Sequence, residues 1–178
     1  MEYITSDWKG TIYIWDIGNN KNDRTDLCIY KINGKDILTK ETIKAEKISY
    51  SYPDQKSFPP DKKELYYDSE GMAFFNDSIY IYTKCWTEPW DGKSFCYTVP
   101  AKAGVYKASK KYELVIGKTG WWKDAITAVE IKNQKHYFLT YNRLIIYQLV
   151  NGSITYDTRI MLGPISQNEA VAINSKGV

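Results

Sequence analysis

The chain has 178 residues, of which 43% are hydrophobic, and this is enough for one domain with its own core and no metal or disulfide cross-links. Its 24 basic and 21 acidic side chains leave a net charge of only +3, which argues against the strongly basic surface of a nucleic-acid binder. The 16 tyrosines and 6 tryptophans favour strands, and the composition excludes disorder and coiled coils.

Short runs of alternating apolar and polar residues predict strands along the chain, and no segment keeps a helical period over three turns. In chain order the expected strands are 2–4, 11–15, 29–32, 47–52, 70–72, 78–82, 96–99, 112–116, 127–131, 136–140, 145–149, 154–161 and 167–172. The predicted fold class is therefore all-β.

The predicted strands repeat along the sequence. Residues 2–4, 11–15 and 29–32 are echoed by residues 70–72, 78–82 and 96–99, which follow 67 or 68 positions later. Four strands per unit predict a β-propeller, because a four-stranded blade covers its faces only by stacking on its neighbours. The tyrosines at equivalent places in the first two units are expected to be at least half buried: Tyr13, Tyr30, Tyr80 and Tyr97.

The expected blades cover residues 2–54, 68–117 and 126–162, and a fourth blade is expected to start within 167–178. Propellers usually close with about four to eight blades. We therefore expect either that a longer chain completes the ring or that copies of this chain associate to close it.

Several motifs in this repeat resemble a known family. Residues 2–7, 12–20 and 22–32 resemble the uncharacterised, often secreted bacterial β-propeller proteins with the patterns D-W-E-D-I, Y-I-G-D-I-G-N-N and N-R-x-D-L-x-I-Y-x-I. The similarity continues through residues 50–54, 68–72, 79–86, 97–100 and 167–169. The resemblance implies a propeller with a site on its channel face and a secreted or periplasmic location, although residues 1–7 lack the features of a signal peptide.

Cysteine and histidine usage limits the chemistry. Cys28, Cys85 and Cys96 form no C-x-x-C pair, and His136 is the single histidine, so no familiar zinc site can be assembled. The cysteines are expected to be buried hydrophobic residues, with a disulfide between Cys85 and Cys96 as the alternative. His136 is expected to be a packed or solvated strand residue, which weakens any Ser-His or Cys-His nucleophile scheme.

Polar side chains are expected to meet on the propeller face where the loops into the innermost strands and the loops between second and third strands open. On that face Trp86 would stack on a ligand, and Lys84 would pair with Glu70 or meet an anionic group. The alternative is that these groups only neutralise one another and hold the loops. The predicted ligand-binding residues are Glu2, Asp16, Asn19, Asn20, Arg24, Asp68, Glu70, Lys84, Trp86 and Glu169.

Two further features of this face bear on its ligand. Carboxylate and amide oxygens from successive blades are the ligands that calcium requires, and they predict a calcium site at Glu2, Glu70, Glu169 and Asn19. Trp121 and Trp122 could stack on sugar rings, but packing between blades is the favoured interpretation for both.

The leading functional interpretation is a non-enzymatic binding module for a small molecule, a carbohydrate or a protein. The lack of a positioned histidine favours binding over hydrolysis. A calcium-dependent hydrolase resembling lactonase or phytase propellers is one alternative, and a structural fragment without a ligand is the other. Neither nucleic acid nor a membrane span is expected.

Overall fold

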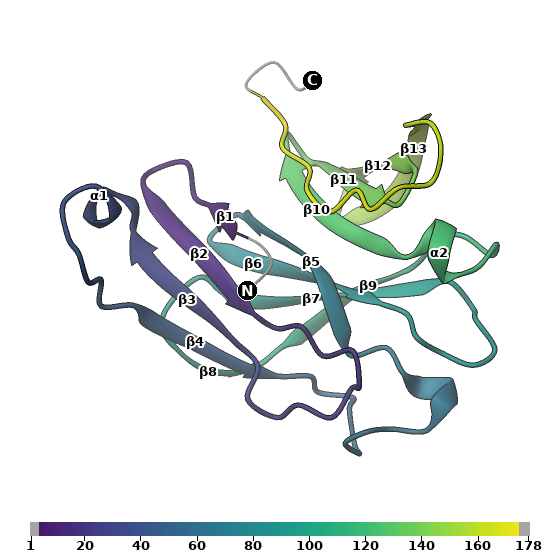
Figure 1. The fold of residues 1–178 in the computed structure, drawn as a ribbon, viewed down its shortest axis with the longest axis horizontal. Coiled ribbons are helices and arrows are strands. Elements are labelled where there is room, and N and C mark those ends of the chain that lie inside the picture. Colours follow the sequence, from purple (N-terminus) through teal and green to yellow (C-terminus); the bar gives the residue numbers. More distant parts are fainter. Residues whose placement is uncertain (1–3, 175–178) are drawn as a thin grey trace.

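The computed structural model describes residues 4–174 and confirms the all-β class (Figure 1). The first sheet has the strand order β1-β2-β3-β4-β8, and a short helix, α1 (Gly34–Ile37), follows β3. Its strands are β1 (Ile4–Ser6), β2 (Thr11–Asp16), β3 (Cys28–Asn33), β4 (Glu46–Ser51) and β8 (Gly104–Lys107).

The second and third sheets have four antiparallel strands each. A 3-10 turn, η1 (Lys62–Glu64), precedes the second sheet, and α2 (Trp121–Asp124) precedes the third. The second sheet contains β5 (Asp68–Phe75), β6 (Ser78–Lys84), β7 (Lys93–Pro100) and β9 (Ser109–Val115). The third contains β10 (Ile126–Lys132), β11 (Lys135–Thr140), β12 (Arg143–Val150) and β13 (Ser153–Met161).

The three sheets stack face to face, with the second in the middle. Side-chain alternation along β6 sends Ile79 and Ile81 into the core shared with the first sheet, whereas Tyr80 and Tyr82 enter the core shared with the third. The second sheet is therefore covered on both faces. The four equivalent tyrosines are buried as expected, Tyr13 and Tyr97 almost completely and Tyr30 and Tyr80 for the most part.

One strand was absent from the sequence-based expectation. β8 pairs in parallel with β4, with Tyr50 opposite Tyr106, although it lies between β7 and β9 in the chain. It is a four-residue edge strand whose Val105 is 87% exposed, so it carries no apolar alternation that would mark it in the sequence. The first sheet consequently has one strand more than the repeat predicts.

The expected strand at 167–172 needs correction, because residues 162–174 of the described chain contain no strand. Side chains bind this segment in place of a backbone ladder: the Thr127 hydroxyl donates to the Asn168 carbonyl, and the Asn168 amide donates to the Tyr141 carbonyl. Val171 and Ile173 pack on the outer face of the third sheet. The expected start of a fourth blade is therefore an irregular segment as far as residue 174.

The two ends of the stack differ in their connections. At one end, which we call the turn end, two-residue turns with positive φ angles join β5 to β6, β10 to β11 and β12 to β13. At the other end, the loop end, segments 17–27 and 85–92 join the second and third strands of the first two sheets. Segments 52–67 and 116–125 lead into β5 and β10 at this same end.

All three cysteines are buried and free, so Cys85 and Cys96 form no disulfide. No helix in residues 4–174 has the length and apolar character needed to cross a membrane.

Candidate functional site

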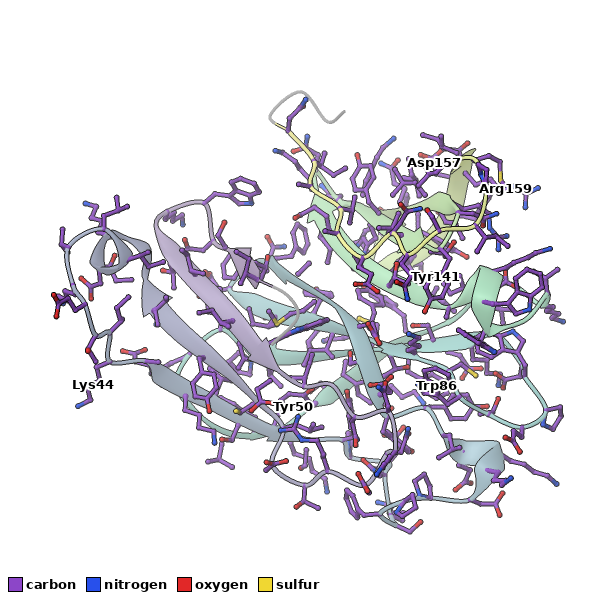
Figure 2. The ribbon with its side chains drawn as sticks, in the orientation of Figure 1. Lys44, Tyr50, Trp86, Tyr141, Asp157 and Arg159 are labelled. Carbon is purple, nitrogen blue, oxygen red and sulfur yellow. The ribbon has the colours of Figure 1, made fainter. Side chains whose placement is uncertain are left out.

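Five side chains and the backbone N–H of Asn19 at the loop end, from all three sheets, form hydrogen bonds and ring contacts with one another. Trp86 and Tyr141, labelled in Figure 2, come from the loops that follow β6 and β11. The loop-end cluster, as we name it, consists of Asn19, Asp68, Glu70, Lys84, Trp86 and Tyr141.

Asp68, the first residue of β5, connects two of these loops. Its side chain is buried, with Oδ1 accepting the Asn19 backbone N–H at 2.7 Å and Oδ2 accepting the Trp86 Nε1–H at 2.7 Å. Burial raises the pKa of Asp68, and the bonds from Trp86 and Asn19 oppose that rise. The carboxyl group therefore fixes the position of the Trp86 ring.

Lys84, the last residue of β6, forms a buried ion pair. Its Nζ lies 3.0 Å from Glu70 Oε1 and 3.3 Å from the Tyr141 hydroxyl, and the Lys84 and Glu70 side chains are 6% and 16% exposed. Burial opposes the charge on Lys84, but Glu70 and then Tyr141 outweigh it and raise the lysine pKa. Lys84 is therefore stabilised as a cation, with Glu70 of its own sheet on one side and Tyr141 of the third sheet on the other.

Aromatic rings surround this cation. Lys84 Nζ lies 5.0 Å from the Trp86 ring centroid and 5.7 Å from that of Tyr141. Trp121 packs at 5.7 Å from Trp86 in a tilted arrangement and at 6.1 Å from Tyr141 in an edge-on one. Trp121 and its neighbour Trp122 are nevertheless 47% and 44% exposed.

A cavity of about 270 Å³ opens beside these rings. The aromatic cleft, as we name it, is lined by Trp121, Trp122, Tyr141, Ile165, Ser166 and Gln167. The expectation that Trp121 and Trp122 pack between blades holds in part: Trp121 contacts Trp86 of the second sheet and Tyr141 of the third, but nearly half of each tryptophan is exposed at this cleft.

The short helix that carries both tryptophans is anchored by Asp124. This buried carboxylate accepts the Thr119 backbone N–H at 2.5 Å and the Thr119 hydroxyl at 2.6 Å, and it pairs with Arg143 of β12. Burial alone would raise the pKa of Asp124, but the bonds from Thr119 and Arg143 outweigh it and lower the pKa. Gly117 has to be glycine, because a Cβ there would overlap Asp124.

The segment 17–27 contributes a second polar group at the outer side of the loop end. Arg24 pairs with Asp16 at 2.8 Å and with Asp26 at 2.9 Å. The buried Asn19 side chain accepts the Arg24 backbone N–H at 3.0 Å and donates to the Tyr67 carbonyl at 3.0 Å. These ion pairs and hydrogen bonds hold the loop in place.

The predicted site residues thus divide into groups. Asn19, Asp68, Glu70, Lys84 and Trp86 come together, and Asp16 and Arg24 form their own pair beside them. Asn20 and Glu169 are exposed, and Glu2 lies outside the described residues.

Tyr141 was missed in the sequence. Tyr141 directly follows β11 just as Cys85 directly follows β6. Aligning the repeats would therefore have predicted that Tyr141 lies at the loop end.

The predicted calcium set does not fit the donors that the structure brings together. In residues 4–174 no group of three or more histidine, cysteine, aspartate or glutamate side chains gathers in a form that could hold a metal ion. Glu70 already pairs with Lys84, so a metal ion there would meet an ammonium group 3.0 Å from the carboxylate. Asn19 Oδ1 is likewise engaged, by the Arg24 backbone N–H.

No protein-family model matches the sequence, and no curated protein matches it. Among solved structures, the chain is similar to the crystal structure of Saccharomyces cerevisiae Sqt1, with a TM-score of 0.40 and 12% sequence identity. The match covers 83% of this chain and 29% of that one, so it spans less than a third of the solved chain. A likeness of this degree says nothing about activity or partners.

Proposed function

We propose that the chain is a non-enzymatic binding module of the β-propeller type, whose ligand occupies the aromatic cleft. The observation that carries this proposal is the half exposure of Trp121 and Trp122 next to a buried ion pair. Binding pockets are mostly apolar and aromatic, with a few fixed polar groups that orient the ligand. The aromatic cleft and the loop-end cluster combine these two properties.

The packing of the sheets supports the propeller architecture. The first strands of the three sheets lie side by side, β5 between β1 and β10. Gly71 of β5 approaches β10 so closely that a Cβ would overlap Val129. First strands that converge in this way are expected around a propeller axis, which is also the architecture that the family resemblance implies.

The state of the polar groups favours binding over catalysis. Asp68 is engaged by Trp86 and Asn19, and Lys84 is engaged by Glu70. His136 is buried between the second and third sheets, where desolvation lowers its pKa to about 4. A general acid or base must reach the substrate and titrate near the working pH, and these groups do not combine the two properties.

A melting-temperature screen tests the proposal. Small molecules, oligosaccharides and peptides would be added to the wild-type chain, to the double variant Trp121→Ala/Trp122→Ala and to Trp8→Ala. Trp8 is a matched control, because it is 67% exposed and lies under a lysine, Lys132, at the turn end.

We expect at least one ligand class to raise the melting temperature of the wild type and of Trp8→Ala but not that of the double variant, since only a ligand bound to the folded state stabilises it. Ligands that stabilise all three proteins equally, or none that stabilises any, would remove the cleft as a binding site.

A further inference from the structure

We infer that the ligand of the aromatic cleft is a neutral oligosaccharide of pyranose rings with a flat C–H face, such as β-linked glucose or xylose units. This inference rests on the proposed function and names the ligand class of the same site. It is supported by the fixed aromatic rings, by the polar residues that line the same cleft and by the pairing of the buried charges.

The aromatic rings form a stacking surface that is already in place before a ligand arrives. Tyr141 meets Trp121 edge-on at 79°, and Trp86 lies behind it, itself fixed by the 2.7 Å bond to Asp68. Trp122 is the next residue of α2 and is also half exposed. Adjacent exposed indoles suit rings that offer an apolar face, because stacking buries hydrocarbon on both sides without ordering new side chains.

Segment 165–167 adds the apolar Ile165 and two uncharged polar residues to the lining of the cleft. The polar residues are Ser166 and Gln167, and the Ser166 backbone N–H donates to the Tyr141 carbonyl at 3.1 Å, which ties this segment to the aromatic residues. A hydroxyl and a carboxamide both donate and accept hydrogen bonds. A pyranose ring has the matching pattern, with C–H bonds on its face and hydroxyl groups around its edge.

The charges beneath the cleft are paired inside the protein. Lys84 pairs with Glu70, and Asp124 pairs with Arg143. At the rim, Lys123 Nζ lies 4.4 Å from the centroid of the Trp122 ring. A charged ligand would lose its hydration without gaining one of the buried groups as a partner, and Lys123 already lies over the Trp122 ring, so the cleft favours a neutral ligand.

Isothermal titration calorimetry with cellopentaose and xylopentaose tests the inference. We expect at least one of them to bind the wild-type chain, and Trp121→Ala and Trp122→Ala each to weaken that binding about tenfold or more, as central aromatic contacts do. Trp8→Ala serves as the matched control and should bind like the wild type. Because Trp121 and Trp122 are half exposed, both variants should keep the wild-type circular dichroism spectrum.

The remaining outcomes overturn the inference. Failure of both pentasaccharides to bind, or equal binding to the variant Trp121→Ala/Trp122→Ala, contradicts it. Tighter binding of tetragalacturonate, which is anionic, than of either neutral sugar also contradicts it. If a peptide or another small molecule binds in a Trp121-dependent way while the sugars do not, the saccharide class is wrong and the proposed function stands. If no ligand depends on these tryptophans, both fall.

Discussion

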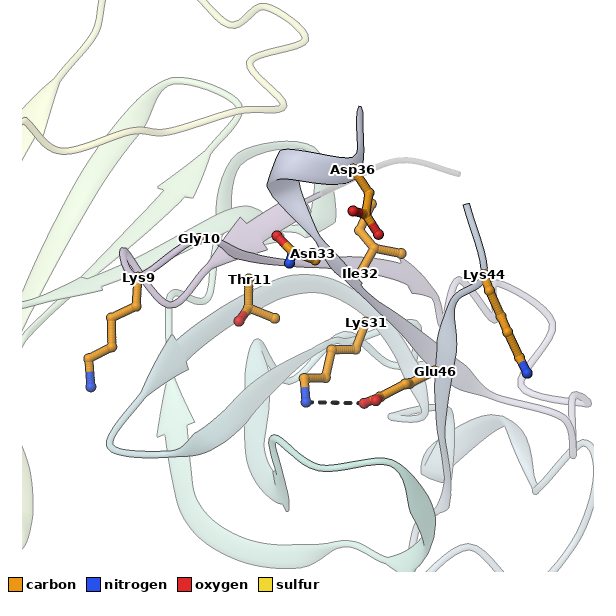
Figure 3. A pocket seen from close by; sticks show the side chains of 9 residues that line it. All are labelled: Lys9, Gly10, Thr11, Lys31, Ile32, Asn33, Asp36, Lys44 and Glu46. Atoms are coloured by element: carbon orange, nitrogen blue, oxygen red, sulfur yellow. Dashed lines mark hydrogen bonds and ion pairs between the residues drawn. The ribbon is translucent and has the colours of Figure 1, made fainter. Parts of the chain in front are cut away.

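At the loop end buried polar side chains bond from one sheet to the next, whereas at the turn end of the first sheet the ion pairs lie between β3 and β4 or within their connection, and the cross-sheet bonds are those of Thr5 and Tyr13 to backbone groups. Asp68 receives hydrogen bonds from segment 17–27 of the first sheet and from Trp86 of the second, and Lys84 reaches Tyr141 of the third. In contrast, Lys31 pairs with Glu46 on the neighbouring strand at 3.1 Å (Figure 3). The loop end therefore depends on the stacking of all three sheets.

The cavities at the two ends show that size alone does not mark a site. The turn end of the first sheet has the larger cavity, about 400 Å³, and Figure 3 shows that Lys9, Lys31 and Lys44 line it. Lys9 and Lys44 are exposed long side chains. The smaller aromatic cleft is bordered by rings that are packed on one another, and rigid side chains lose less entropy on binding.

The largest expected effect of a substitution comes from the buried ion pair between β5 and β6, Lys84 with Glu70. Lys84→Met leaves Glu70 buried without its cation and should lower the free energy of unfolding by about 3 kcal/mol. Lys31→Met breaks an ion pair of similar length at the turn end, where the Glu46 side chain is 60% exposed. This substitution should change the free energy of unfolding by no more than about 0.5 kcal/mol. Urea unfolding measures both, and equal losses would contradict the contrast between the two ends.

His136 gives the stack a defined pH dependence. Its pKa is lowered from 6.5 to about 4, so between these values the unfolded chain binds a proton that the folded chain does not. The contribution of His136 to the free energy of unfolding is fully present above pH 6.5 and falls by about 3 kcal/mol as the pH drops to about 4.

His136→Gln keeps a hydrogen-bonding group near the Tyr82 hydroxyl but cannot titrate. The difference in unfolding free energy between wild type and variant should therefore change between pH 7 and pH 4. A difference that is constant with pH would show that His136 is not buried in its neutral form.

The bond between Trp86 and Asp68 carries a smaller effect. Trp86→Phe removes the indole N–H and leaves one oxygen of a buried carboxylate without that donor, which should cost about 2 kcal/mol of stability. The same change should raise the pKa of Asp68 further, because that hydrogen bond lowers it. Unfolding curves and a carboxyl NMR titration measure the two effects. Trp121→Phe, at a half-exposed ring, is the control and should be nearly neutral.

The smallest expected effect is a gain of stability at the turn end. Gln134 has φ 62° in the turn between β10 and β11, a conformation that glycine adopts without a steric penalty. Gln134→Gly should stabilise the chain by about 0.5 kcal/mol, since the relief of strain exceeds the entropy lost by glycine. Asn133→Gly is the matched control and should change little, because asparagine tolerates its φ of 51°. Thermal unfolding that shows a loss for Gln134→Gly would contradict the argument.

Residues whose role follows from local pattern could be predicted from the sequence. The alternation of Ile79 to Tyr82 fixes which side chains face each neighbouring sheet, and the repeat places Lys84 and Trp86 at the loop end of β6. Contacts between sheets have no such pattern. Tyr141 reaches Lys84 across 57 positions in sequence, and only the stacking of two sheets brings them together.

The sequence pattern also could not predict the exposure of aromatic side chains or the pairing of an edge strand. An aromatic pair such as Trp121 and Trp122 has the same sequence whether it is buried or exposed, and the short α2 decides the outcome here. β8 is too short and too exposed for periodicity to detect, so its pairing with β4 depends on the position of the β7–β9 connection in space.

The parallel pairing of β8 with β4 joins the folding of two sheets into one event. The chain leaves the second sheet after β7, adds β8 to the first sheet with Gly104 opposite Ile48, and returns as β9. The edge strand of the first sheet is therefore supplied by the connection between two strands of the second, and the pairing raises the contact order of the chain. The first two sheets should therefore open and close as one cooperative unit in hydrogen exchange, with the third sheet, which takes all its strands from one continuous stretch, as a separate one.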